Sequence, residues 1–147
     1  MQHSRSIGRY ISIIYRQAQC YINRKLEAFG IGSGQFIFLN ILYQQDGIRQ
    51  EEISYLLDID KGTTARAIKK LEEEGYVYRK IDSNDRRAQL VFLTDRALSI
   101  KGDIFKILRN WTDILVDGFS EEDKQKSINL LEAMTKNIHQ YYNREEK

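Results

Sequence analysis

The sequence predicts a mainly α-helical protein with a small β-hairpin. The first observation behind this prediction is the absence of proline from all 147 residues, which favours long helices because proline breaks helix interiors. The second is that apolar residues recur at steps of three and four along most of the chain. The third is a short segment after Gly75 in which this period changes to two, as in β-strands.

Composition excludes several classes of protein. The chain has 41% apolar and 30% charged residues, which fits a folded domain and not a disordered chain. Its single cysteine, Cys20, excludes an intramolecular disulfide. Arg5, Arg9 and Arg16 interrupt the apolar residues near the N-terminus, so we expect neither a secretory signal nor a membrane span. These features predict a soluble, cytoplasmic protein with no membrane partner.

Two helices are expected in the first third of the chain. The first covers residues 7–29 and ends at Gly30. Ser33 is expected to cap the second, which runs to about Gln45 before the turn signal Asp46-Gly47. The apolar stripe of the first helix consists of Ile7, Ile11, Ile14, Ala18 and Tyr21.

Two shorter helices are expected next. One covers residues 51–57 and is expected to turn Ile53, Leu56 and Leu57 inward. The other covers residues 61–74, is capped by Asp60 and ends at Gly75, because glycine is favoured just after the last turn of a helix. Its expected inner stripe is Thr64, Ile68 and Leu71.

A two-stranded hairpin and two long helices complete the expected fold. Residues 77–82 and 90–93 have strand-like patterns, and the polar residues 83–88 form the loop between them. A helix then runs from Thr94 to about residue 117, and Ser120 with the acids after it starts the last helix. The apolar stripes of these helices are Ile104, Leu108, Trp111 and Leu115, and Ile128, Leu131, Met134, Ile138 and Tyr141.

Positive charge gathers on one of the short helices although the net charge of the chain is only +2. Residues 61–70 hold four cations and no acid. Two short helices followed by a hairpin form the outline of a winged helix-turn-helix, whose second helix enters the major groove of DNA. The expected DNA-contacting residues on this recognition helix are Lys61, Thr63, Arg66, Lys69 and Lys70.

These residues differ in the contact that each can make. A guanidinium can bond guanine through two parallel hydrogen bonds, so Arg66 is the candidate for reading a base. Lys61, Lys69 and Lys70 are candidates for phosphate contacts, which position the helix without reading sequence. Thr63 is expected to touch either a base or a phosphate. The alternative is that this basic face is an ordinary solvated helix face.

The hairpin loop offers a second basic element. Arg86 and Arg87 are expected at its tip, where they can enter a minor groove of strong negative potential. Asp85 is adjacent to both, and a bare carboxylate at a DNA surface reduces affinity. We therefore expect Asp85 to orient one of the two arginines through a charge-assisted hydrogen bond.

The same residues carry a resemblance to a known family. Asp85-x-Arg87-x-x-x-Val91-x-Leu93-Thr94 resembles the wing signature of the MarR family of bacterial and archaeal transcriptional regulators. The recognition helix and first wing strand of that family resemble residues 60–66, Leu71-Glu72 and residues 75–77 of this chain. The helix that precedes them in the family resembles residues 50–59. With the flanking long helices, the resemblance covers nearly the whole chain.

This resemblance implies a homodimer with two winged-helix lobes. Residues 1–30 and 100–147 would form the helical dimerisation region, and residues 31–99 the DNA-binding domain. Such proteins bind pseudo-palindromic operators, usually to repress, and many release DNA when a small phenolic or aromatic compound binds between lobe and dimer region. By its place in the motif, Arg87 would be the wing arginine and Asp85 its brace.

Other residues have two readings that the sequence leaves open. Tyr15 and Arg16 either bind an aromatic carboxylate effector, or Arg16 is a surface arginine or part of an ion pair between subunits. Cys20 either senses oxidants or is a buried, inert thiol, and the lack of a neighbouring histidine favours the second reading.

The sequence weighs against catalysis. It contains no nucleophile–base pair and no cofactor fingerprint, and its two histidines and one cysteine do not have metal-ligand spacing. We therefore expect no enzyme activity, cofactor or metal. Two classes remain: a dimeric regulator that binds double-stranded DNA, and a winged-helix module that binds proteins. Steep loss of duplex binding with salt distinguishes the first from the second.

Overall fold

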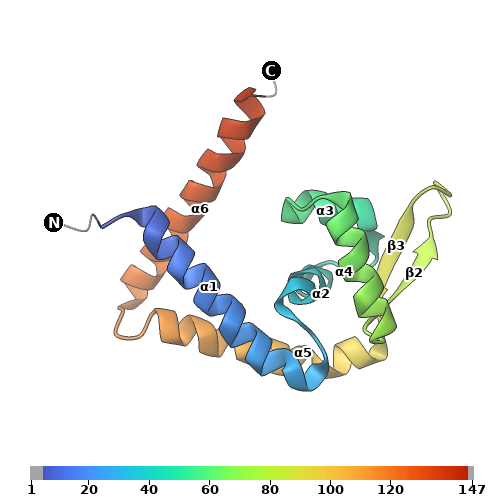
Figure 1. Ribbon diagram of the computed structural model, residues 1–147, viewed down its shortest axis with the longest axis horizontal. Coiled ribbons are helices and arrows are strands. Elements are labelled where there is room, and N and C mark those ends of the chain that lie inside the picture. Colours follow the sequence, from blue (N-terminus) through green and yellow to red (C-terminus); the bar gives the residue numbers. More distant parts are fainter. Residues whose placement is uncertain (1–4, 146–147) are drawn as a thin grey trace. The chain divides into compact units, whose positions relative to one another are not determined.

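The computed structural model describes residues 5–145 (Figure 1). The extreme ends of the predicted terminal regions, residues 1–4 and 146–147, lie outside the described residues. The described chain forms two compact units that divide between Arg109 and Asn110, within the long helix α5 (Asp95–Leu115). The fold is mainly α-helical with a small antiparallel sheet, as predicted.

The first unit begins with α1 (Ile7–Leu26), the short 3-10 helix η1 (Glu27–Phe29) and α2 (Ser33–Gln44). The prediction that Ser33 caps α2 is wrong, because the extended cap residue is Gly32 and Ser33 is already helical. The backbone N–H of Ser33 instead donates to Oδ1 of Asn23 on α1 at 2.6 Å. An N–H in the first helical turn has no partner within its own helix, so a side chain of the preceding helix satisfies it.

The sheet has three strands, not the two predicted. Strand β1 (Ile48–Arg49) lies beside β3 (Gln89–Leu93), and β3 lies between β1 and β2 (Val77–Ile81). Both pairs are antiparallel, with Ile48 opposite Val91 and Val77 opposite Leu93. A strand of two residues is too short to show a period of two, so the sequence pattern did not reveal β1.

Between β1 and β2 lie α3 (Gln50–Leu57) and α4 (Lys61–Glu73). The predicted inner stripe of α4 is confirmed, since Thr64, Ile68 and Leu71 are all buried. The prediction for Leu56 is wrong, because this side chain is exposed. The buried face of α3 passes through Ile53 and Ser54, and three helical steps place Leu56 about 60° from Ile53, on the side away from Ser54.

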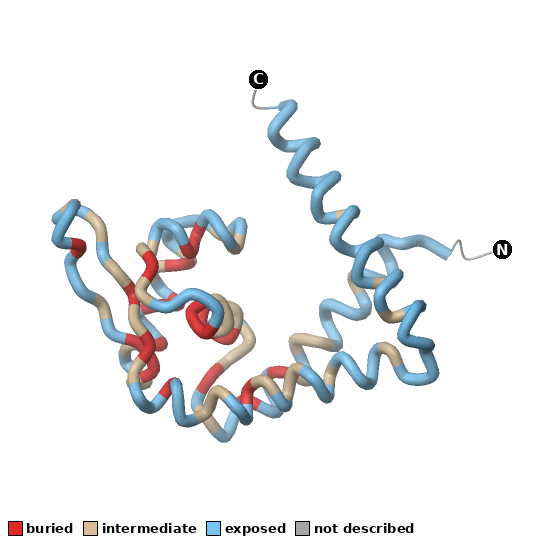
Figure 2. The backbone as a smooth tube through the Cα atoms, turned by 180° about the vertical axis from the view of Figure 1, so that it is seen from behind, coloured by how far each residue is buried: buried red, intermediate tan, exposed pale blue. Residues whose placement is uncertain are grey.

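The hydrophobic core of the first unit lies between α2, α3, α4, the sheet and the first half of α5, where the buried residues gather (Figure 2). Two tyrosine hydroxyls hold distant segments across this core. The Tyr76 hydroxyl donates to the carbonyl of Phe29, and the Tyr43 hydroxyl donates to the carbonyl of Ala97. Burial raises the pKa of the Tyr43 hydroxyl to about 12, because it stands away from water.

The second unit consists of the end of α5 and α6 (Glu121–Glu145). Gly118, at φ +79°, lies between them, and Ser120 caps α6 by accepting from the backbone N–H of Asp123, as expected. No described residue of α6 is buried in the single chain (Figure 2). The stripe of Ile128, Leu131, Ile138 and Tyr141 is therefore exposed apolar surface. In the described part of the chain, no helix has the length and apolar composition needed to cross a bilayer.

The packing of α4 predicts a large effect for its central apolar residue. Ile68 is fully buried, so Ile68→Ala should lower the free energy of unfolding by about 2–5 kcal/mol through lost burial and the cavity left behind. Urea unfolding at fixed protein concentration measures this change. Ile81→Ala is the matched control, because Ile81 is 66% exposed and its truncation should cost about 0.5 kcal/mol or less. Equal losses for the two variants would contradict the position of α4 in the core.

Candidate nucleic-acid interface

The N-terminus of α4 is held by a network of three side chains. Asp60 caps the helix by accepting from the backbone N–H of Thr63 and from the Thr63 hydroxyl, both at 2.7 Å. These two hydrogen bonds lower the pKa of Asp60, which stays ionised at the positive end of the helix. The Thr63 oxygen also accepts from Nη2 of Arg66 at 3.1 Å, so the exposed guanidinium of Arg66 is tethered one turn into α4.

The cations of α4 do not all have the same environment. The ammonium of Lys61 lies 2.7 Å from Oε1 of Glu51, the second residue of α3, and the bond to Lys61 lowers the pKa of Glu51. Sequence inspection missed this pair because its members are ten positions apart on different helices. Both groups are solvent-exposed, and exposed ion pairs contribute little stability, so Lys61 can exchange Glu51 for another anion at low cost. Lys69 and Lys70 are exposed further along α4.

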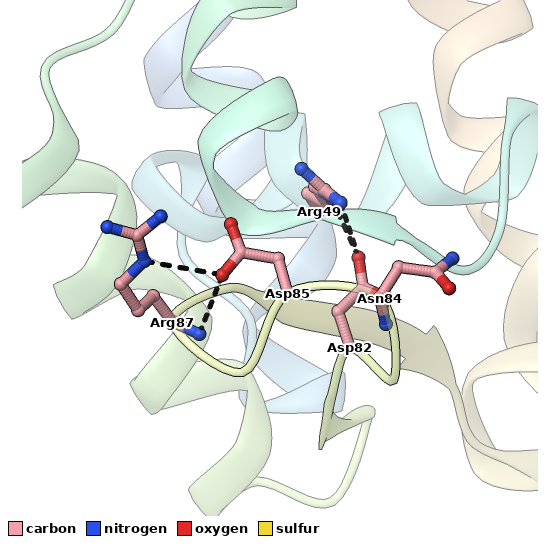
Figure 3. Close-up of polar contacts among 5 residues, drawn as sticks. All are labelled: Arg49, Asp82, Asn84, Asp85 and Arg87. Carbon is pink, nitrogen blue, oxygen red and sulfur yellow. Dashed lines mark hydrogen bonds and ion pairs between the residues drawn. The ribbon is translucent and has the colours of Figure 1, made fainter.

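The wing, which we define as residues 77–93, carries the other basic residues at its tip. Oδ1 of Asp85 accepts from the backbone N–H of Arg87 at 3.0 Å and from its Nε at 3.4 Å (Figure 3). The contact expected between Asp85 and one of its neighbouring arginines is therefore present, and its partner is Arg87. The Arg87 side chain is 92% exposed despite this bond, and Arg86 is exposed beside it.

An ion pair that the sequence did not reveal lies at the base of the wing loop. Nε of Arg49 donates to Oδ2 of Asp82 at 2.8 Å, and Nη2 of the same guanidinium lies 2.7 Å from this oxygen in an ion pair (Figure 3). Oδ1 of Asp82 accepts from the backbone N–H of Asn84 at 2.9 Å. The pKa of Asp82 is lowered mainly by the hydrogen bond from Asn84 and further by the contact with Arg49. Arg49 and Asp82 are 33 positions apart in the sequence, and no local sequence pattern links them.

Two further contacts fix the wing to the rest of the first unit. Arg79 on β2 makes a two-pronged ion pair with Glu72 near the end of α4, at 2.9 and 3.1 Å, which lowers the pKa of Glu72. At the other strand, the backbone N–H of Leu93 donates to Oδ1 of Asp46 at 2.8 Å. Side chains thus join the wing to α4 and to the segment before β1.

The remaining candidates lie on α1. Tyr15 is exposed, and Arg16 donates to the hydroxyl of Ser12 one turn earlier. The expectation that Cys20 is buried is wrong, because this thiol is exposed in the single chain. The buried side chains of α1 are Ile22 and Leu26, and two helical steps place Cys20 nearly opposite Ile22. Across residues 5–145, no three His, Cys, Asp or Glu side chains gather as a metal site would require.

Comparison with known proteins gives the family. The sequence pattern of the MarR family matches residues 31–88, which include α2, α3, α4 and most of the wing. The chain is 49% identical to a MarR transcriptional regulator from Methanosarcina mazei Go1, whose crystal structure matches with a TM-score of 0.88 over 92% of this chain and 97% of that one. The chain belongs to the MarR family. The relatives of this MarR-family protein are transcriptional regulators, in agreement with the prediction that it is not an enzyme.

Two other relatives extend this comparison. The HTH-type transcriptional regulator YwoH of Bacillus subtilis is 38% identical over 109 residues, which cover 74% of this chain and 78% of YwoH. A MarR-family regulator from Listeria monocytogenes, crystallised with a 26mer DNA, is 28% identical and matches with a TM-score of 0.86 over 92% of this chain and 90% of that one.

The cap of α4 predicts a pH-dependent loss of stability. Asp60→Ala removes the acceptor for the Thr63 N–H and should lower the melting temperature by about 2–4 °C at neutral pH. Because the folded pKa of Asp60 is lowered, its contribution is complete above the ordinary aspartate pKa of about 4 and is lost progressively as the pH falls toward the lowered folded pKa. The difference in melting temperature between the variant and the wild type should therefore stay constant from pH 7 to about pH 5 and narrow progressively at lower pH.

Asp60→Asn is the matched control for this experiment. The amide oxygen can still accept from Thr63, so this variant should keep most of the stability. It carries no carboxylate at position 60, so the contribution of this cap should not change with pH. A constant difference between the wild type and Asp60→Ala at every pH would show that the ionised carboxylate is not the stabilising form.

Proposed function

We propose that this MarR-family protein is a homodimeric repressor that binds pseudo-palindromic operators in the cytoplasm. The observation that carries the proposal is that α4 buries one face while the opposite face presents cations beside a wing whose tip exposes two arginines. An apolar inner face and a basic outer face are what a helix in the major groove needs. The Listeria relative crystallised with a 26mer DNA supports duplex DNA as the partner.

The residues of this interface have distinct roles in the proposal. Arg66, held by Thr63, reads a base in the major groove, and Thr63 lies beside it at the start of α4. Lys61, Lys69 and Lys70 bind phosphates, which sets the register of the helix on the duplex. Arg87, braced by Asp85, enters the adjacent minor groove with Arg86. These contacts join residues 31–99 to DNA.

The terminal helices supply the dimer interface in this proposal. Within the proposed dimerisation region, residues 1–30 and 100–147, the described helices leave apolar stripes exposed in the single chain, on α1 at Ile7, Ile11 and Ile14 and on α6 at Ile128 and Leu131. Exposed apolar surface of this extent on a soluble protein marks an interaction surface. A second copy of the chain would cover it and present two recognition helices about one turn of DNA apart.

A small phenolic or aromatic carboxylate ligand completes the proposed regulation. Tyr15 and Arg16 are adjacent on α1, where an aromatic ring and a guanidinium suit such a compound. The contact between Arg16 and Ser12 leaves the alternative of a surface arginine with a local partner. The effector proposal rests on Tyr15 and Arg16 and does not depend on the residues of α4 and the wing.

Salt titration of duplex binding tests the proposed DNA contact. Affinity measured by fluorescence anisotropy should fall steeply with salt, because each phosphate contact releases counterions. Lys69→Ala should weaken binding to all sequences alike and reduce the salt slope by about one per lobe.

Arg66→Ala should cost about 1–3 kcal/mol of binding free energy on the preferred operator and relax the preference at one base pair. A binding curve that does not respond to salt would favour a winged helix that binds protein partners.

The dimer requires its own test. Leu131→Glu places a charge in the exposed stripe of α6 and should raise the dimer dissociation constant about tenfold or more, because a buried leucine contributes about 1.5–3 kcal/mol. Sedimentation velocity at several concentrations measures this change. Leu98→Glu on α5 is the matched control, because Leu98 is 51% exposed and Leu131 is 55% exposed. Unchanged association of Leu131→Glu would exclude this face of α6 from the interface, and equal disruption by both variants would show that the effect of Leu131→Glu is not specific to α6.

A further inference from the structure

Arg49 occupies a position at which its residue type is unexpected. It precedes the first turn of α3 with extended φ and ψ angles of −66° and 141°, and its side chain makes no capping hydrogen bond. Serine, threonine, aspartate and asparagine are the residues that stabilise such a position. The long guanidinium side chain instead reaches Asp82 with two of its nitrogens. Arg49 therefore does not stabilise the start of α3 as a capping residue would, and its contact with Asp82 indicates a separate structural role.

The ion pair crosses the sheet. Arg49 on β1 lies opposite Leu90 of the central strand β3, and Asp82 directly follows Ile81 of β2, which lies opposite Gln89. The Asp82 carboxylate therefore links the end of β2 to β1 across the central strand β3. This contact lies at the end of the sheet where the wing loop begins. Asp82 is only 5% exposed, so solvent screens this pair less than it screens the pairs at the surface of α4.

Asp82 also begins the hydrogen bonds that shape the wing loop, residues 82–88. Its carboxylate accepts from the N–H of Asn84, and its own N–H donates to the carbonyl of Ala88 at 3.0 Å. The N–H of Ala88 in turn donates to the carbonyl of Asp85, whose carboxylate holds Arg87. Through Ala88, these hydrogen bonds form a continuous connection from the start of α3 to the exposed arginine, and Figure 3 shows its two ends, the Arg49–Asp82 pair and the Asp85–Arg87 pair.

A hollow that opens to solvent lies beside this connection. About 200 Å³ lies between the start of α3 and the wing loop, lined by Arg49, Gln50, Glu51, Arg87, Ala88 and Gln89. The loop is therefore not held there by close packing, which would fix its position without polar contacts. Directed ionic bonds can set the geometry of a segment that packing leaves free.

We propose that the Arg49–Asp82 ion pair positions the wing loop so that Arg87 reaches the DNA. Both are positioning residues, and Arg87 makes the contact; the inference rests on the proposed function. The competing role for Arg49 is a direct phosphate contact, since 42% of its side chain is exposed. The two roles predict opposite effects of Asp82→Asn. Loss of the carboxylate weakens a positioned wing, but it frees Arg49 and strengthens a phosphate contact.

The experiment is a double-mutant cycle of Asp82→Asn and Arg87→Ala, with affinity for a selected operator duplex measured by anisotropy at one salt concentration. Asp82→Asn keeps the size of the side chain and should weaken binding roughly fivefold in the wild-type background. In the Arg87→Ala background it should change affinity by less than about twofold, because the residue that it positions is gone. Glu52→Gln, an exposed site on α3, controls for the same change in charge.

Amide hydrogen exchange supplies a readout that does not need DNA. In Asp82→Asn the amides of residues 84 and 87–88 should exchange about tenfold faster, while those of the α4 core residues keep the wild-type rates. Glu52→Gln should leave both groups unchanged. The retained protection of α4 would show that Asp82→Asn is folded, so a loss of affinity could not be assigned to global unfolding.

Each result decides the inference. A fivefold loss that disappears in the Arg87→Ala background, with faster exchange in the wing loop, supports it. An equal loss in both backgrounds, unchanged exchange, or stronger binding by Asp82→Asn than by Glu52→Gln overturns it, and the last result assigns Arg49 to a phosphate. If the wild type binds no duplex at any salt concentration, the proposed function itself fails, which is distinct from a wild type that binds and shows no coupling.

Discussion

The burial of one face of α4 is the constraint on which the rest of the interface depends. Thr64, Ile68 and Leu71 pack into the core, and the Thr64 hydroxyl donates to the carbonyl of Asp60 at 3.0 Å. Because a helix has a fixed rotation per residue, seating these three side chains also fixes the directions of Arg66, Lys69 and Lys70. These cations therefore point toward solvent without needing contacts of their own to hold them there. Their display is a result of apolar packing on the other side of the helix.

The charged residues around this helix divide into two kinds of contact. Arg79 donates two hydrogen bonds to the Glu72 carboxylate, and Arg49 contacts one oxygen of Asp82 with two nitrogens; each pair includes a partly or fully buried group. Lys61 with Glu51 is exposed on both sides and makes one bond. Rigid, two-pronged pairs suit the holding of a scaffold, whereas a single exposed bond can be exchanged for an incoming anion. The chain therefore separates charges that maintain geometry from charges that are available for binding.

The sequence predicted the helices, the hairpin and the inner stripe of α4 because these features depend on local periodicity. Asp60 and Ser120 were identified as caps for the same reason, since a cap and the backbone N–H that donates to it lie within four residues. The strand β1, the Asn23 bond to Ser33 and the Arg49–Asp82 pair were not predictable, because each depends on segments brought together only by the fold. Leu56 and Cys20 show a related limit. An apolar residue type does not tell which side of a helix is covered, and that side depends on the neighbouring elements.

The uncovered stripe on α6 has a thermodynamic consequence for the isolated chain. Apolar side chains that remain in water contribute nothing to the folded state until a second surface reaches them. Any molecule that covers them only in the folded form shifts the folding equilibrium by mass action. If a second copy of the chain covers this stripe, as proposed, the melting temperature rises with protein concentration and falls on dilution.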